Sequence, residues 1–150
     1  MRDFDDVYKR NKMRDETLGG KKGMRDEYTG DKIFKQTARN SPYKHPVSKT
    51  IDGDHITSGS NIEKRYKDLS PQQRKEMAND RSNIAYTNSS LNRSKGDRSN
   101  MEYLADKVKR GEHINPKTGM NMVGKQIKSE VTLEAKAAKY RMNNMFDKRK

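Results

Sequence analysis

The scarcity of large apolar side chains is the feature that most limits what this chain can fold into. Leu, Ile, Val and Phe together supply 20 of its 150 residues, while 37% of the residues are charged. A fraction this low, combined with high charge, is typical of chains that cannot bury enough apolar surface to stay folded. Any folded core must therefore be small. Without further signals, the composition predicts a partly disordered basic protein that becomes ordered on a partner.

Helix start signals nevertheless recur in the second half of the chain. A serine followed three positions later by Glu or Gln occurs at Ser60, Ser70 and Ser99, and each such capping box predicts a helix. The first two boxes predict a helical insert over residues 61–80. The third helix is expected to end at Gly111. Its expected inward face consists of Met101, Leu104, Ala105 and Val108.

The C-terminal region divides into an expected loop and a long amphipathic helix. Residues 111–125 contain Asn-Pro and two further glycines, which favour turns, and are expected to form the loop. Beyond it, apolar positions recur every three or four residues, as on one face of a helix. We expect this face to pack within the molecule, with docking on a partner as the alternative. Its residues are Ile127, Val131, Ala135, Ala138, Met142 and Met145.

Short strands are expected in the middle of the chain. Residues 48–56 have strand character, and Gly53 within them marks a bulge or a close approach of the backbone. A second strand is expected from Asn83 to Thr87, and Asn88 can cap the helix that follows it. The predicted fold class is therefore α+β, predominantly helical by residue count.

The charge balance indicates the kind of partner. A net charge of +13 favours a polyanion partner, which is nucleic acid or, less often, an anionic membrane surface. The chain has no cysteine, which excludes disulfides and a Cys-ligated zinc. Residues 1–26 are expected to form a polar arm, and the stretch from Met1 to Arg10 lacks the apolar segment of a signal peptide. No run is apolar enough to cross a membrane, so we expect a cytoplasmic protein that acts away from membranes.

One group of polar residues has the composition of a site that cleaves phosphodiesters. Such a reaction needs a base for water, charge that neutralises the phosphate, and assistance to the leaving oxygen. His55 is the candidate base, because a neutral imidazole accepts protons near neutral pH. Asp54 and Asn92 can offer oxygen ligands to one hard cation. So few protein ligands suit Mg²⁺, or Mn²⁺ in its place, because Mg²⁺ retains several waters.

Neighbouring residues are expected to assist this site. Lys95 follows the asparagine ligand by three positions, on the same helix face, and can contact a phosphate oxygen. Arg93 and Arg98 are expected to bind the nucleic-acid backbone as well. Asn83 can hold the loop that carries the base through hydrogen bonds to its backbone. Asp52 is expected at most to support the metal ligands as a second carboxylate.

Asp54 and His55 are adjacent in the sequence, and this constrains the site. Adjacent side chains on a regular strand point to opposite faces of the sheet. Both residues can serve one site only where the strand bulges or ends. Gly53 before them and Thr57-Ser58-Gly59 after them make such a break plausible.

The ordered motifs resemble the HNH endonuclease signature. They are Asp-His-Ile at residues 54–56, Asn-Ile-x-x-Thr from Asn83, and Asn-Arg-x-Lys-Gly-Asp from Asn92. The resemblance is to the variant whose last histidine is asparagine, as in RNA-guided CRISPR nucleases and many phage-borne proteins. Residues 27–33 also resemble the turn that opens many HNH domains, which carries a Cys pair in zinc-bearing members. The resemblance covers residues 27–98.

This resemblance implies a small ββα-metal core, with further helices before and after it, that cleaves DNA to 5′-phosphate and 3′-hydroxyl ends. It assigns Asp54 and Asn92 to the metal, His55 to the general base and Asn83 to the supporting asparagine. The helical insert between the strands is longer than in many members, and this leaves Asn79 as an alternative to Asn83. The choice of DNA as the substrate rests on the resemblance alone, so RNA remains an alternative substrate. The number of strands cut, the sequence specificity and the oligomeric state stay open too.

Two alternatives to an endonuclease are consistent with the sequence. One is a nucleic-acid-binding module with this fold and no activity. It would share salt-sensitive binding with the enzyme, but only the enzyme requires the metal and His55. The other is a structural or assembly protein, for instance of a phage, that docks on a protein partner through the helices of residues 99–150. If the gene is carried by a phage, the cytoplasm concerned is that of the host cell.

Overall fold

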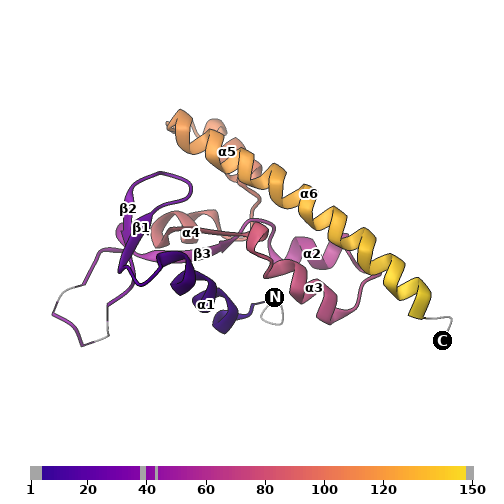
Figure 1. Ribbon diagram of the computed structural model, residues 1–150. Coiled ribbons are helices and arrows are strands. Elements are labelled where there is room, and N and C mark those ends of the chain that lie inside the picture. The colour runs from indigo at the N-terminus through magenta and orange to yellow at the C-terminus, as the bar shows by residue number, and fades with distance from the viewer. Residues whose placement is uncertain (1–4, 38–39, 43, 148–150) are drawn as a thin grey trace.

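The computed structural model describes residues 5–37, 40–42 and 44–147. The fold is α+β and predominantly helical, with two separate two-stranded antiparallel sheets (Figure 1). The elements, with η marking a short 3-10 helix, are α1 (Val7–Leu18), β1 (Gly23–Arg25), β2 (Lys32–Phe34), η2 (Val47–Lys49), β3 (Ile51–His55), α2 (Gly59–Arg65), α3 (Pro71–Ala78), η3 (Arg81–Asn83), β4 (Ile84–Asn88), α4 (Ser89–Lys95), α5 (Asn100–Lys109) and α6 (Pro116–Asp147).

Strands β3 and β4 and helix α4 form a ββα unit that carries the candidate site. β3 pairs antiparallel with β4, and Asp54 lies opposite Ala85. α4 follows β4 without a loop, because the side chain of Asn88 accepts a hydrogen bond from the backbone N–H of Leu91. The cap expected at Asn88 is thus confirmed, and it fixes the point at which the strand turns into the helix.

The two helices between β3 and β4 begin at serine caps. Ser70 forms the expected capping box with Gln73 at the start of α3. α2 begins two residues earlier than expected, because the side chain of Ser58 accepts a hydrogen bond from the backbone N–H of Asn61 at 3.2 Å. Ser60 therefore lies inside α2 and does not cap it.

Helix α1 packs against the antiparallel pair of strands β3 and β4, although residues 1–26 were expected to form an arm. Leu18 at its end is buried among apolar side chains of β2, β3 and β4. The hydroxyl of Tyr86 on β4 donates a hydrogen bond to the carbonyl of Arg10 at 2.8 Å. These two contacts, one apolar and one polar, place α1 beside the strand that carries the candidate catalytic residues. Residues 1–4 of the expected arm lie outside the described residues.

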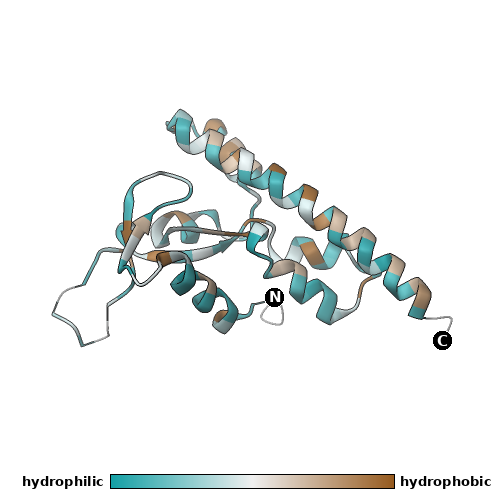
Figure 2. Cartoon of the chain, viewed as in Figure 1, coloured by the Kyte–Doolittle hydropathy of each residue, from teal (hydrophilic) through white to brown (hydrophobic). Residues whose placement is uncertain are grey.

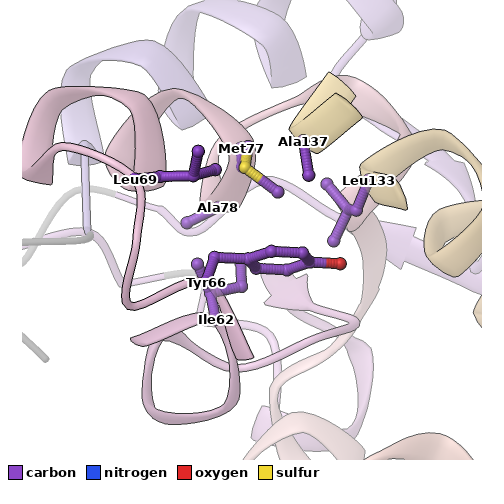
Figure 3. Packing of buried hydrophobic residues seen from close by; sticks show 7 residues of the cluster. All are labelled: Ile62, Tyr66, Leu69, Met77, Ala78, Leu133 and Ala137. Carbon is purple, nitrogen blue, oxygen red and sulfur yellow. The ribbon is translucent and has the colours of Figure 1, made fainter. Parts of the chain in front are cut away.

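An apolar cluster joins α2 and α3 to α6 (Figure 3). The ring of Tyr66 lies within it, and its hydroxyl donates a hydrogen bond to Glu134 of α6 at 2.6 Å. This cluster attaches the helical insert to the C-terminal helix, and we call it the apolar cluster. It consists of Ile62, Tyr66, Leu69, Met77, Ala78, Leu133 and Ala137.

Helix α6 begins earlier than the sequence suggested. The loop expected over residues 111–125 ends at Asn115, whose Oδ1 accepts hydrogen bonds from the two backbone N–H groups that follow Pro116. Proline suits the first position of a helix, where its missing N–H has no role. Gly119 and Gly124, which favoured a loop, lie inside α6.

The apolar stripe expected to face inward from α6 faces solvent. Ile127, Val131 and Met142 are 51%, 66% and 59% exposed. The buried face lies on the opposite side and includes Gln126 and Ser129, which are buried because their side chains have hydrogen-bond partners. The expectation of intramolecular packing was therefore wrong. The buried residues of α6 are Met122, Gln126, Ser129, Leu133 and Ala137.

The expected inward face of α5 was also largely wrong. Met101 and Val108 are 42% and 67% exposed, and Ala105 is exposed as well, while Leu104 is partly buried. The buried residues are Asn100 and Tyr103. The Asn100 side chain donates a hydrogen bond to the carbonyl of Met122 at 2.8 Å, and this bond turns a polar face of α5 toward α6.

No membrane-spanning helix is found among the described residues. α6 has 32 residues, but it and the other described helices lack the long apolar stretch that spanning a bilayer requires.

Candidate active site

A cleft of about 400 Å³ is formed by residues from β3, α4 and the N-terminal segment. Asp54 and His55, at the end of β3, line it together with Asn92 of α4. Arg10 of α1 and Asp5, which precedes this helix, line it too. The structure therefore brings together three residues selected from the sequence and adds two from the segment expected to be an arm.

Asp54 is buried and is held through one of its two oxygens. Its Oδ2 accepts hydrogen bonds from the Tyr28 hydroxyl at 2.6 Å and from the Lys95 ammonium at 2.7 Å. No described residue donates to its Oδ1, and the residue lines the cleft. Burial raises the pKa of the Asp54 carboxyl, while Lys95 and the Tyr28 hydroxyl oppose that rise. One oxygen is thus used by the protein and the other is available to a ligand.

Lys95 lies behind Asp54, away from solvent. Its side chain is 0% exposed, and its ammonium also approaches the carbonyl oxygens of His55 and Ile56 at 3.3 and 3.5 Å. Burial of this charge is tolerated because the carboxylate and the carbonyl groups replace its hydration. The expected contact of Lys95 with a phosphate oxygen is contradicted by this burial. The lysine neutralises Asp54 and supports the backbone at the end of β3.

Asn92 is oriented by a second carboxylate. Its Nδ2 donates a hydrogen bond to Oδ2 of Asp52 at 3.2 Å. Because the amide nitrogen is used in this way, the carbonyl Oδ1 of Asn92 is the atom left for a ligand. Asp52 lies two residues before Asp54 on β3, and alternation along a strand places both side chains on one face. Asp52 thus contacts the candidate ligand Asn92, and its expected support of a metal site stays a prediction.

The donor atoms in the cleft suit a hard divalent cation with few protein ligands. A carboxylate oxygen and an amide oxygen are ligands that Mg²⁺ and Mn²⁺ accept. Within residues 5–37, 40–42 and 44–147, no three His, Asp or Glu side chains form a group that could hold a metal. An ion in this cleft would therefore take most of its ligands from water and from the substrate.

His55 is oriented by Asn79. Its Nε2 lies 3.1 Å from Oδ1 of Asn79, and the Asn79 amide nitrogen donates to the carbonyl of Lys75 at 3.0 Å. With the amide fixed in this way, Oδ1 is the acceptor, so Nε2 carries the proton and Nδ1 is unprotonated. Burial lowers the pKa of His55, and the hydrogen bond to Asn79 opposes this change. The ring is therefore neutral at neutral pH, and no described residue donates a hydrogen bond to its Nδ1.

Asn83 is buried, and its described hydrogen bonds do not involve the ring of His55. Its Oδ1 accepts hydrogen bonds from the backbone N–H of Thr57 at 2.7 Å and from the Ser129 hydroxyl at 2.8 Å. Its Nδ2 donates to the carbonyl of Thr57 at 3.0 Å. The two candidate asparagines therefore differ in position: Asn79 orients the ring, and Asn83 holds the backbone that follows β3.

Arg10 contacts the strand at Gly53. Its Nη1 donates a hydrogen bond to the Gly53 carbonyl at 3.2 Å, and its Nε and Nη2 donate to the two oxygens of Asp5 at 2.8 and 2.9 Å. A Cβ atom at Gly53 would lie 3.3 Å from Arg10 Nη1, which is a crowded distance. Gly53 thus permits a close approach and does not form a bulge. The strand ends at His55, the last residue of β3.

The two arginines expected to bind nucleic acid differ in their contacts with the rest of the chain. Arg93 is exposed on α4, and no described residue pairs with it. Arg98 donates a hydrogen bond to Asp106 at 2.7 Å and lies over the Tyr103 ring, with its guanidinium carbon 5.1 Å from the ring centroid. Arg93 is therefore free to meet a phosphate, while Arg98 would first have to leave Asp106.

Tyr28 reaches the site from the turn between β1 and β2, and sequence reasoning missed it. Its backbone N–H donates to Oδ1 of Asp26 at 2.8 Å, and Asp26 also accepts hydrogen bonds from the side chains of Thr87 and Asn88 on β4. The buried carboxylate of Asp26 thus attaches the turn to β4 and places the Tyr28 hydroxyl against Asp54. Tyr28 and Asp54 are 26 residues apart, so no local motif links them.

Comparisons with known proteins add nothing to this geometry. No protein-family model, curated protein or solved structure matches the chain. A functional assignment therefore depends on the contacts described above.

Proposed function

We propose that this chain is a metal-dependent endonuclease that hydrolyses DNA phosphodiester bonds in the cleft. The observation that best supports this proposal is a set of three acceptor atoms on residues that line one cleft. They are Oδ1 of Asp54, Oδ1 of Asn92 and Nδ1 of His55, and no described residue donates to any of them. Two oxygen acceptors suit a divalent cation, and a neutral imidazole nitrogen suits a proton from water.

Asp54 and Asn92 would hold Mg²⁺ or Mn²⁺. When bound, such an ion supplies positive charge that stabilises the phosphate and the leaving oxygen. Lys95 and Tyr28 hold the Asp54 carboxylate through Oδ2, so its other oxygen is presented to the cleft. Asp52 keeps the carbonyl end of Asn92 free through its contact with the amide nitrogen.

His55 would activate the attacking water. Its Nδ1 accepts the water proton, while Asn79 holds Nε2–H and keeps the ring in position. The pKa of His55 is lowered by burial, so the ring is ready to accept a proton at neutral pH. As the HNH resemblance implies, the products would carry 5′-phosphate and 3′-hydroxyl ends.

Arg10 is the cationic residue best placed to meet the substrate phosphate. It lines the cleft and is 18% exposed at its side chain. Asp5 occupies two of its N–H groups, in the paired geometry that a phosphate also adopts with a guanidinium. A phosphate entering the cleft can therefore replace Asp5. Arg10 thus takes the role that the sequence suggested for Lys95.

The substrate class follows from the charge and the resemblance together. A net charge of +13 favours binding to a nucleic acid, with strong dependence on salt. The choice of DNA over RNA comes from the HNH resemblance. The proposal places the activity in the cytoplasm, which is that of the host cell if a phage carries the gene.

Relaxation of supercoiled plasmid tests the proposal. We expect nicking by the wild-type chain with Mg²⁺ and none after chelation. His55→Ala should lower the rate by about 100-fold or more, because it removes the base. His113→Ala is the matched control, since this histidine is exposed and lies outside the cleft; it should cut like the wild type.

Two results would count against the endonuclease. Undiminished cutting by His55→Ala would refute the assigned base. Absence of cutting by the wild-type chain on plasmid DNA and on single-stranded RNA would refute the activity. Salt-sensitive binding without cutting would then favour the inactive nucleic-acid-binding module.

A further inference from the structure

The outer face of α6 carries a row of exposed apolar residues, interrupted at Gly124. In Figure 1 the strands and helices α1 to α4 lie on one side of this helix and α5 overlaps it, and Figure 2 shows hydrophobic residues along its length. The large side chains of the row are 51% to 76% exposed. Single exposed apolar residues are ordinary, but a row of them in a chain this poor in apolar residues indicates a contact surface. We call it the α6 stripe: Met120, Ile127, Val131, Ala135, Ala138, Met142 and Met145.

The α6 stripe has the spacing of a seam between two helices. From Val131 to Met145 its members alternate intervals of four and three residues, as the a and d positions of a heptad do. Met120 and Met142 lie eleven residues before and after Val131, a period that keeps a row on one face of a nearly straight helix. From Met120 to Met145 the helix rises about 38 Å.

The two edges of the α6 stripe differ in charge. Helical spacing places Lys128 and Lys139 along one edge and Glu130 and Glu134 along the other. Arg141 also lies on the glutamate edge, where Asp68 pairs with its guanidinium at 2.7 Å. When two copies pair in parallel about a two-fold axis, the lysine edge of each meets the glutamate edge of the other. An antiparallel pair would set lysine beside lysine and glutamate beside glutamate.

We propose that the α6 stripe is a dimerisation surface on which α6 of a second copy of this chain packs in parallel. Glu134 and Lys139 flank Ala135 and Ala138, at the g and e positions that form ion pairs between helices. The Tyr66 hydroxyl uses only Oε1 of Glu134, so Oε2 can meet Lys139 of the partner subunit. Lys139 has no described partner within its own chain.

The size of the α6 stripe predicts a weak dimer. A row about 38 Å long, on a helix about 10 Å across, buries on the order of 800 Å² in total when paired. Stable interfaces usually bury about 1,200 Å² or more, and the +13 charge of each copy opposes association. Dimerisation is therefore expected to depend on concentration in the micromolar range.

Sedimentation equilibrium of the full chain tests the proposal without DNA or metal. Between about 5 and about 200 µM, in about 0.3 M salt to screen the net charge, the mass should rise toward that of two chains. Val131→Glu should weaken association at least about tenfold, since it places like charges in the seam, and Val131 is exposed enough to spare the fold. Tyr8→Glu, at a 78% exposed residue of α1, is the matched control.

The orientation can be tested because the chain contains no cysteine. Ala138→Cys should form a disulfide-linked dimer on mild oxidation of a parallel pair. In an antiparallel pair centred on the stripe, the two cysteines would lie about 15 Å apart along the axis. Glu134→Lys should weaken the dimer, and adding Lys139→Glu should restore it.

Three results would overturn the proposal. If the wild-type chain stays monomeric over the whole concentration range, the α6 stripe is not a dimerisation surface, and a different protein would be its partner. Unchanged association of Val131→Glu would place the contact elsewhere. Failure of Ala138→Cys to cross-link a chain that does dimerise would exclude the parallel arrangement.

Discussion

Two of the buried centres in the described part of the molecule have opposite chemistry. The polar centre behind the cleft consists of Tyr28, Asp54 and Lys95, and each group is satisfied by another. The apolar cluster beneath α6 is held by buried area, and Leu133 of α6 belongs to it (Figure 3). A buried ion pair adds little stability beyond a well-packed apolar group of the same size, but losing one partner is severe. The polar centre is therefore explained better by the position it gives Asp54 than by stability.

The largest loss of stability is expected when one partner of the ion pair in the polar centre is removed and the other is kept. Lys95→Met keeps the length of the side chain but leaves Asp54 buried without its counter-charge. We expect a loss of about 4 kcal/mol in the free energy of unfolding at neutral pH, measured by urea denaturation. A loss below about 1 kcal/mol would show that Asp54 does not depend on the lysine.

The same variant tests the direction in which stability changes with pH. Without Lys95, burial leaves the pKa of Asp54 raised in the folded state, so the folded chain binds a proton more tightly than the unfolded chain. Its stability should therefore be greatest below the unfolded pKa and fall as the pH rises through the folded pKa. The destabilisation relative to the wild type should thus be smaller in acid than at neutral pH.

Substitutions in the apolar cluster should lower the stability according to the buried apolar area that they remove. Leu133→Ala is expected to cost about 3 kcal/mol, because it removes buried apolar volume and leaves a cavity. Val131→Ala, two residues away on the same helix, should change the stability by less than about 0.5 kcal/mol, because Val131 is largely exposed. Equal costs from chemical denaturation would contradict the assignment of the two faces of α6.

Two buried tyrosines compare the centres directly. Tyr28→Phe removes a hydrogen bond to the buried Asp54 and should cost about 2 kcal/mol. Tyr66→Phe removes a hydrogen bond to the exposed Glu134 and should cost about 0.5 kcal/mol. Thermal unfolding of both variants measures the difference, and a reversed order would show that the polar centre is not the more demanding of the two.

The smallest expected contribution to stability comes from the lowered pKa of His55. Burial lowers its pKa below the ordinary value of 6.5, so the folded chain binds a proton there less readily than the unfolded chain. The stability this supplies is present above 6.5 and is lost as the pH falls through the lowered folded pKa. NMR titration of the ring, with the signal identified by His55→Gln, should give the lowered value. A titration at or above 6.5 would contradict the buried, neutral base.

Local signals predicted the parts of the fold that depend on neighbouring residues. Ser70 and Asn88 cap their helices as expected, because a cap involves only three or four consecutive residues. The face of α6 was predicted wrongly, because periodicity identifies an apolar face without showing what covers it. Gln126 and Ser129 are buried only because partners on other elements satisfy them.

The candidate site was predictable in part for the same reason. Asp54, His55 and Asn92 belong to motifs with fixed spacing, and they line one cleft. The spacing placed Lys95 on the helix face of Asn92 but could not show that it lies behind a carboxylate. Arg10 comes from a segment with no distinguishing pattern, and only the packing of α1 on β4 brings it to the cleft.

The most direct test of the account is the Mg²⁺ dependence of plasmid cleavage by the wild-type chain and by Asn92→Ala. The amide oxygen of Asn92 is one of two protein ligands assigned to the ion, so its loss should weaken metal binding. We predict that half-maximal cleavage by Asn92→Ala requires at least about tenfold more Mg²⁺, with part of the rate recovered at saturation. Identical Mg²⁺ dependence of the two chains, or cleavage that needs no divalent ion, would contradict the assigned metal site and the mechanism built on it.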